Sequence, residues 1–158
     1  MPKSPAWAKN VVKQVLWTAI DRELTPREVD ALWANFGSAC AYCGASLRRG
    51  DKSAHKDHLL PVELGGTNHI SNRVLSCAAC NEKEKRDEPW LDFLTRKVPD
   101  RALFDARKTK IEVWRQQHAD SFVPVSAGVR EIWIQEKDRL ACEIELSLTR
   151  VRAAKRGP

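Results

Sequence analysis

The sequence of 158 residues contains no apolar run approaching the ~18 residues that a membrane span requires. Its first ten residues, MPKSPAWAKN, also lack the apolar core of a secretion signal. We therefore expect no membrane association and a cytoplasmic location. Internal repeats and low-complexity tracts are missing as well. With 42% apolar and 30% charged residues, the composition is that of a soluble globular chain.

Acidic residues are outnumbered. The chain has 27 Lys and Arg against 21 Asp and Glu, a formal net charge of +6, which favours a polyanionic partner. The excess is concentrated in residues 91–158, which carry 14 basic and 10 acidic side chains. Any electrostatic hold on such a partner is therefore expected mainly from the C-terminal part.

Composition divides the chain into three segments, and we expect these to be its domains. They are an N-terminal helical segment 1–39, a central core 40–94 and a C-terminal helical extension 95–158. Apolar spacing in the extension predicts helices at 99–117 and about 129–153, separated by a break at 121–128.

The clearest helix signal is a capping box. Thr25 is a suitable N-cap, Pro26 suits the first helical position and Glu28 completes the box. Gly37 is expected to end this helix.

The central segment has short apolar runs instead. Leu59–Val62 and Arg73–Ser76 are the best strand candidates, and Gly65–Asn68 is a strong turn signal between them. A helix is expected after Cys80. The predicted fold class is α+β, with a small hairpin core flanked by N- and C-terminal helices.

Four of the five cysteines form two Cys-x-x-Cys pairs, Cys40 with Cys43 and Cys77 with Cys80. Four thiolates suit tetrahedral Zn²⁺ and leave no position for water, so the predicted zinc is structural. Disulfides are the alternative, but the missing secretion signal argues against them. Cys142 stands apart, and we expect it to be a buried thiol.

A zinc deaminase is a second alternative, because such enzymes use His-x-Glu followed by Pro-Cys-x-x-Cys. Here Asp57 replaces the required Glu and Ser76 replaces the Pro, while Cys40 and Cys43 would have no role. The pattern therefore favours a different zinc protein.

The two Cys-x-x-Cys pairs, or cysteine knuckles, are part of a longer compound motif. Its parts are Asp57-His58-Leu59-Leu60-Pro61, Gly65-Gly66, Asn72 and Cys77-Ala78-Ala79-Cys80-Asn81. In this order and spacing they resemble the cysteine-knuckle branch of the HNH endonuclease family, over about residues 38–94. The resemblance implies a ββα-metal finger, a two-stranded hairpin followed by a helix, with His58 on the first strand and Asn81 on the helix.

The chemistry of phosphodiester hydrolysis agrees with these residues. A neutral His58 can take a proton from water as general base. Asp57 and Asn81 offer the oxygen ligands that a catalytic Mg²⁺ or Mn²⁺ prefers. Because neighbouring strand residues point to opposite faces, we expect a bend or bulge between Asp57 and His58. The resemblance implies that the Asn72 side chain spans the loop and orients the histidine backbone.

Two departures from the family are visible. The family usually continues as Cys-Asn-x-x-Lys-Gly, and here Glu84 occupies the position of that lysine. In addition, no His follows Asn81 on the helix. Phosphate contacts are expected instead from a set of basic residues, although a solvated helix end explains its last two members equally well. The set is Lys83, Lys85, Arg86, Arg150 and Arg152.

The sequence therefore predicts a metal-dependent endonuclease acting on DNA. The alternatives are a non-catalytic zinc module that binds nucleic acid and a nuclease that cleaves RNA. Cutting of both DNA strands would require a homodimer or a second binding event.

Overall fold

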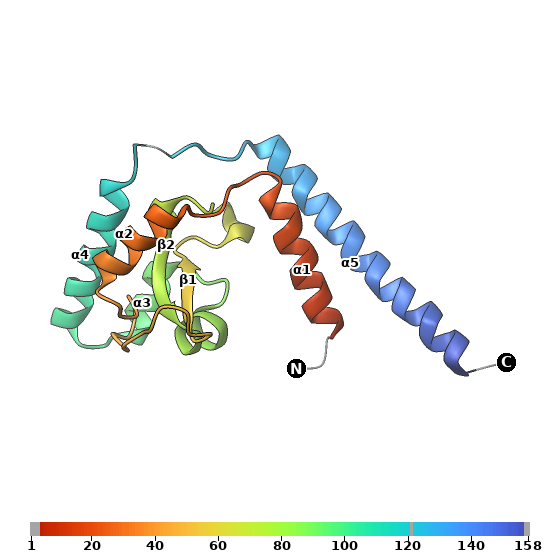
Figure 1. Ribbon diagram of the computed structural model, residues 1–158, viewed down its shortest axis with the longest axis horizontal. Coiled ribbons are helices and arrows are strands. Elements are labelled where there is room, and N and C mark those ends of the chain that lie inside the picture. Colours follow the sequence, from red (N-terminus) through yellow and green to blue (C-terminus); the bar gives the residue numbers. More distant parts are fainter. Residues whose placement is uncertain (1–3, 121, 157–158) are drawn as a thin grey trace. The chain divides into compact units, whose positions relative to one another are not determined.

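A computed structural model describes residues 4–120 and 122–156 (Figure 1). The chain splits into two compact units, one made of Glu23–Pro124 and one that combines Met1–Arg22 with Val125–Pro158. This division differs from the three segments expected from composition. Helices on both sides of the cysteine-rich segment belong to the same unit as that segment.

The unit Glu23–Pro124 is built on an antiparallel hairpin of β1 (Ala54–His58) and β2 (Arg73–Cys77). Asp57 lies opposite Val74 and His58 opposite Arg73. The second strand was predicted correctly. The first was placed too late, at Leu59–Val62.

The reason lies in the hydrogen bonding after His58. Pro61 has no N–H to donate to a ladder, and the N–H and C=O of Leu60 are taken by the side chain of Asn72. A short 3₁₀ turn, Val62–Leu64, follows, and a second, Ile70–Asn72, leads into β2. Leu59 and Val62 are buried by loop packing and not by a sheet.

Three helices and a π-helical segment complete this unit. They are α2 (Pro26–Phe36), the π-helix η3 (Ala79–Lys85), α3 (Trp90–Lys97) and α4 (Arg101–Gln117). The predicted capping box is present in α2, where the Glu28 N–H donates to Thr25 Oγ1 and the Thr25 N–H to Glu28 Oε2. Gly37 ends the helix in the left-handed region, with φ of 59°.

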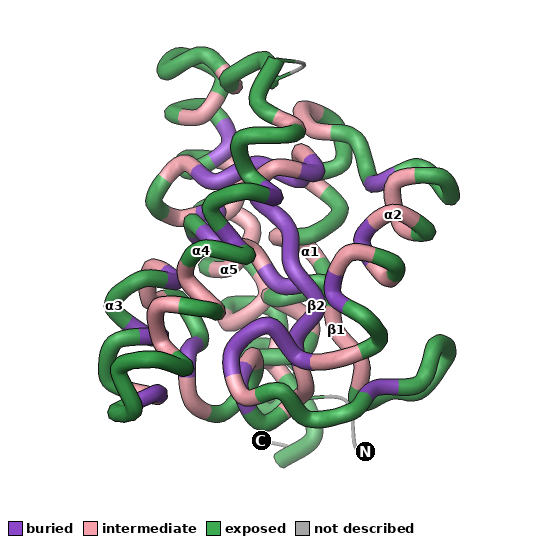
Figure 2. Tube along the Cα trace, turned by 90° about the vertical axis from the view of Figure 1, so that its left-hand side faces the viewer, coloured by how far each residue is buried: buried purple, intermediate pink, exposed green. Residues whose placement is uncertain are grey.

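The core of the unit lies along β2, whose first four residues are all buried (Figure 2). Tyr42 packs edge-on against Phe93, and Phe36 against Trp114. The indole N–H of Trp114 donates to the carbonyls of Ile70 and Arg73, at 3.1 and 2.9 Å. Helix α4 is thereby fixed to the start of β2, and the α+β fold class is confirmed.

The other unit pairs α1 (Pro5–Thr18) with α5 (Ala127–Arg156). Trp17 and Trp133 are both buried and meet edge-on, with ring centroids 4.9 Å apart. Lys9 and Glu145 form an ion pair at 2.7 Å. The two helices predicted in the C-terminal extension are both present, as α4 and α5. None of the helices in the described part of the chain is long and apolar enough to cross a membrane.

Candidate active site and metal centre

The two cysteine knuckles meet in space. The turn at residues 40–43 is closed by the Gly44 N–H, which donates to the Cys40 carbonyl, and Gly44 has a φ of 78° that favours glycine. Cys77 ends β2 and Cys80 lies in η3. The sulfur atoms of Cys40, Cys43, Cys77 and Cys80 all lie within 4.8 Å of one another.

Hydrogen bonding within this cluster makes Cys40 its preferred thiolate, whereas burial raises the pKa of Cys43. The Cys80 thiol donates to Cys40 and lowers the pKa of Cys40 to about 4, while the pKa of Cys80 is raised correspondingly. Four sulfur ligands fit tetrahedral zinc and fill its coordination shell, so the cluster is compatible with a structural zinc site. Cys142, in contrast, is exposed on α5, and the prediction that it is buried was wrong.

His58, the last residue of β1, lies between two polar side chains of the neighbouring loop and strand. Its Nε2 lies 2.9 Å from Asn68 Oδ1, and its Nδ1 lies 2.9 Å from the guanidinium of Arg73, which also contacts Nε2. Because a guanidinium only donates, the ring nitrogen that accepts from Arg73 carries no proton. The imidazole is then neutral, which is the form that a general base requires.

The loop between the strands is held by Asn72. The Asn72 amide N–H₂ donates to the carbonyls of Leu60 and Thr67, at 3.0 and 2.9 Å, and its oxygen accepts from the Leu60 N–H at 2.8 Å. This is the loop-spanning arrangement that the resemblance implied. Gly66 allows it, because a Cβ at this position would lie 1.7 Å from the Leu60 carbonyl oxygen.

Asp57 lies on the other face of the strand. Its carboxylate is 4% exposed and accepts from the Tyr42 hydroxyl at 2.8 Å, and it pairs with the Lys85 ammonium at 3.2 Å. Burial raises the pKa of Asp57 above its usual value, and the Lys85 charge and the Tyr42 hydrogen bond oppose that shift. The strand register is regular through Asp57 and His58, so the expected bulge is not present and the two side chains diverge.

Asn81 has a different partner again. Its amide group lies 2.9 Å from Nδ1 of His55, whose Nε2 lies 3.5 Å from a Glu82 carboxylate oxygen. Carboxylate and amide oxygens are suitable ligands for Mg²⁺ or Mn²⁺. Asp57 and Asn81, however, are each engaged with other protein groups, so this arrangement does not bring them together as a two-ligand site.

The structure also changes the set of predicted phosphate contacts. The Lys85 side chain is fully buried, and besides Asp57 its ammonium donates to the His58 carbonyl at 2.7 Å. It is therefore not available to a phosphate, in contrast to the prediction. Lys83 is exposed within η3 and Arg86 directly after it, and Arg150 and Arg152 are exposed on α5.

Sequence reasoning missed Tyr42, Asn68 and Arg73. Asn68 and Arg73 contact His58 directly, whereas Tyr42 binds Asp57. The register of the hairpin was a usable signal for Arg73, because it starts the second strand and so lies opposite the end of the first. Nothing local in the sequence identifies Tyr42, which comes from 15 residues before Asp57.

These features define a class of protein: a short hairpin with a cysteine knuckle at each side, followed by a helical turn that carries the last cysteine of the cluster. A comparison with family models places the segment more narrowly. The family described as HNH endonuclease matches residues 40–89, which confirms the resemblance for that segment. No curated protein matches the chain.

Proposed function

We propose that the protein is an endonuclease that hydrolyses phosphodiester bonds in DNA, with His58 as the general base. The observation that supports this most strongly is the environment of His58 within the HNH-matched segment. The imidazole is neutral, it is oriented by Asn68 and Arg73, and its backbone is followed by a loop that Asn72 fixes at three points.

The reaction follows from these groups. A phosphate that enters beside His58 attracts the Arg73 guanidinium, and the unprotonated ring nitrogen of His58 accepts a proton from water. The resulting hydroxide attacks phosphorus, the bond from phosphorus to the 3′-oxygen breaks, and that oxygen takes up a proton. The products carry 5′-phosphate and 3′-hydroxyl ends. One base serves one strand, so the first product is a nick.

The resemblance to HNH endonucleases implies that a divalent cation, Mg²⁺ or Mn²⁺, takes part in the reaction. When bound, it would neutralise charge on the phosphate and on the leaving oxygen. Asp57 and Asn81 carry suitable oxygens, but the Asp57 carboxylate would first have to leave Lys85, whereas Asn81 contacts His55 through its amide nitrogen. The steps above are therefore assigned to His58 and Arg73 alone.

The test is nicking of supercoiled plasmid with Mg²⁺ or Mn²⁺ and with EDTA. His58→Ala should lower the rate by about 10²- to 10⁴-fold, the usual contribution of a general base. The matched control is His118→Ala, because His118 packs on Trp114 and has no contact with His58 in the described structure. Equal rates for His58→Ala and the wild type would contradict the proposal. Cleavage of an RNA duplex in place of DNA would reassign the substrate.

A further inference from the structure

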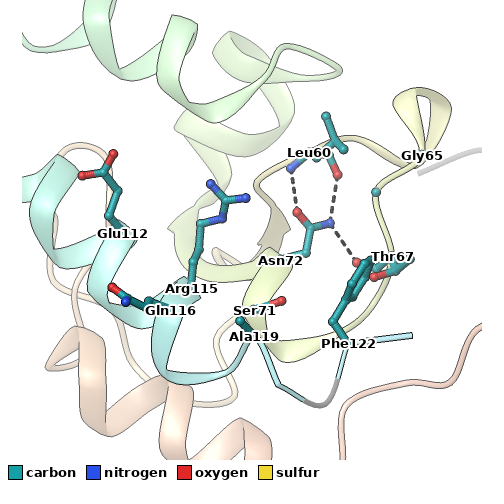
Figure 3. A pocket seen from close by; sticks show the side chains of 11 residues that line it. Leu60, Gly65, Thr67, Ser71, Asn72, Glu112, Arg115, Gln116, Ala119 and Phe122 are labelled. Carbon is teal, nitrogen blue, oxygen red and sulfur yellow. Dashed lines mark hydrogen bonds between the residues drawn. The ribbon is translucent and has the colours of Figure 1, made fainter. Parts of the chain in front are cut away.

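A cavity of about 510 Å³ adjoins the His58 loop on the side of helix α4 (Figure 3). One wall is the loop, with Gly65, Gly66 and Thr67. The other comes from outside the HNH-matched segment, with Arg115 and Gln116 from α4 and Phe122 from the chain that follows it. The volume lies in the range of small-molecule sites.

Each wall offers a different kind of contact. Among residues 4–120 and 122–156, the Arg115 guanidinium has no ion-pair partner, since the nearby Glu112 pairs with Lys108 at 3.7 Å. The Phe122 ring is 42% exposed and is held edge-on against His69, with centroids 5.5 Å apart. A cation, an amide and a half-exposed ring are the groups that bind a phosphate, a base edge and a base face.

The cavity is also physically tied to the candidate base. Asn72 both fixes Leu60 and lines the cavity, and Thr67, another lining residue, directly precedes the Asn68 that contacts His58. A ligand in the cavity would therefore contact the same loop that orients His58.

We propose that this cavity binds one unpaired nucleotide of the substrate, next to the bond that is cut. Phe122 stacks on the base, Gln116 and Thr67 face its polar edge, and Arg115 contacts its phosphate. The inference rests on the proposed nuclease function and adds a substrate class: DNA that contains a bulged or unpaired nucleotide. Taking a base out of an intact duplex costs energy that an unpaired base does not require.

The test measures binding without cleavage. Fluorescence anisotropy in EDTA compares a labelled duplex that has a one-nucleotide bulge with the same duplex fully paired, using the full chain. We expect the bulged duplex to bind roughly tenfold tighter, the usual scale of one base–aromatic stack. Phe122→Ala should remove this preference by lowering the affinity for the bulged duplex toward that for the paired duplex. Arg115→Gln should weaken the binding of the bulged duplex and reduce its dependence on salt.

Two matched controls keep the test specific. Val123→Ala changes an adjacent side chain that is 79% exposed and does not line the cavity, and Arg101→Gln removes an exposed cation from the other end of α4. Equal affinity for the two duplexes, or equal behaviour of Phe122→Ala and Val123→Ala, would overturn the inference. Because no cleavage is involved, this outcome is independent of the nicking result for His58→Ala.

Discussion

Asp57 and His58 are adjacent in the chain, but their side chains lie in different environments. His58 faces Asn68 and Arg73 at the edge of the loop, whereas Asp57 points into the unit and meets Tyr42 and Lys85. The regular strand register is the cause, because alternate side chains leave a strand on opposite faces.

In the Asp57–Lys85 pair, each buried charge is expected to be costly to the fold when its counter-charge is removed. Asp57→Asn leaves a fully buried ammonium without its counter-charge, and we expect a loss of about 3 kcal/mol in the free energy of unfolding. Adding Lys85→Met removes that charge and should restore most of the loss. Urea denaturation of the two variants and the wild type measures this.

An equal loss in the single and double variants would show that the pair is not the source of the effect. The double variant also isolates the chemistry of the carboxylate. Because Lys85 also donates to the His58 carbonyl, Lys85→Met alone is the reference, and a further loss of Mg²⁺-dependent nicking in the double variant would assign the cation to Asp57.

At the scale of elements, the loop between β1 and β2 depends on one glycine. A Cβ at Gly66 would lie 1.7 Å from the Leu60 carbonyl oxygen and 2.8 Å from the Asn72 amide nitrogen, so the backbone would have to move. Gly66→Ala should therefore cost at least about 2 kcal/mol and slow nicking.

Gly128→Ala is the matched control for this substitution. Its Cβ would meet open space near the start of α5, where alanine is the better helix former. Stability should stay the same or rise by up to about 1 kcal/mol. Similar thermal midpoints for the two variants would contradict the role assigned to Gly66.

The end of the π-helix η3 carries backbone strain. Arg86, which follows it, has φ 51° and ψ −117°, a conformation that costs a non-glycine residue about 1–3 kcal/mol. Arg86→Gly should stabilise the protein by about 1 kcal/mol, after part of the gain is lost to the greater freedom of the unfolded chain.

Arg48→Gly makes the same chemical change at an exposed position without a positive φ. It should destabilise slightly, so the two variants should move the thermal midpoint in opposite directions. A decrease with Arg86→Gly would show that the arginine side chain outweighs the strain.

Elements with local signals could be predicted from the sequence. Helix α2 has its N-cap, capping box and terminal glycine in adjacent positions, and each cysteine knuckle is a four-residue pattern. Strand β1 could not be predicted, because Ala54–His58 is mostly polar and the apolar residues after it are buried by the loop. The pairing of Asp57 with Lys85 depends on the width of η3, which the sequence does not reveal.

At the scale of the whole molecule, the two units have separate sources of stability. The four-cysteine cluster lies in Glu23–Pro124, whereas the tryptophan pair and the Lys9–Glu145 ion pair join α1 to α5. Structural zinc binds with an apparent free energy of about 10–16 kcal/mol, as large as the stability of an entire small domain.

Native protein should contain about one zinc per chain, and chelation should unfold the unit Glu23–Pro124 alone. Hydrogen exchange followed by mass spectrometry should show lost protection in β2 and retained protection in α5. Cys43→Ser should reproduce the loss, while Cys142→Ser should not, because Cys142 lies outside the cluster. Native protein without zinc, or an equal loss of hydrogen-exchange protection in β2 and α5, would contradict this prediction.

The π-helix changes the spacing between Asn81 and the residues that follow it. The Arg86 N–H donates to the Asn81 carbonyl five residues earlier, so this turn holds one residue more than an α-helical turn. An ungapped alignment pairs Glu84 with the lysine of the Cys-Asn-x-x-Lys-Gly pattern. Allowing one inserted residue pairs Lys85 with that lysine and pairs Arg86, whose positive φ suits a glycine, with the glycine.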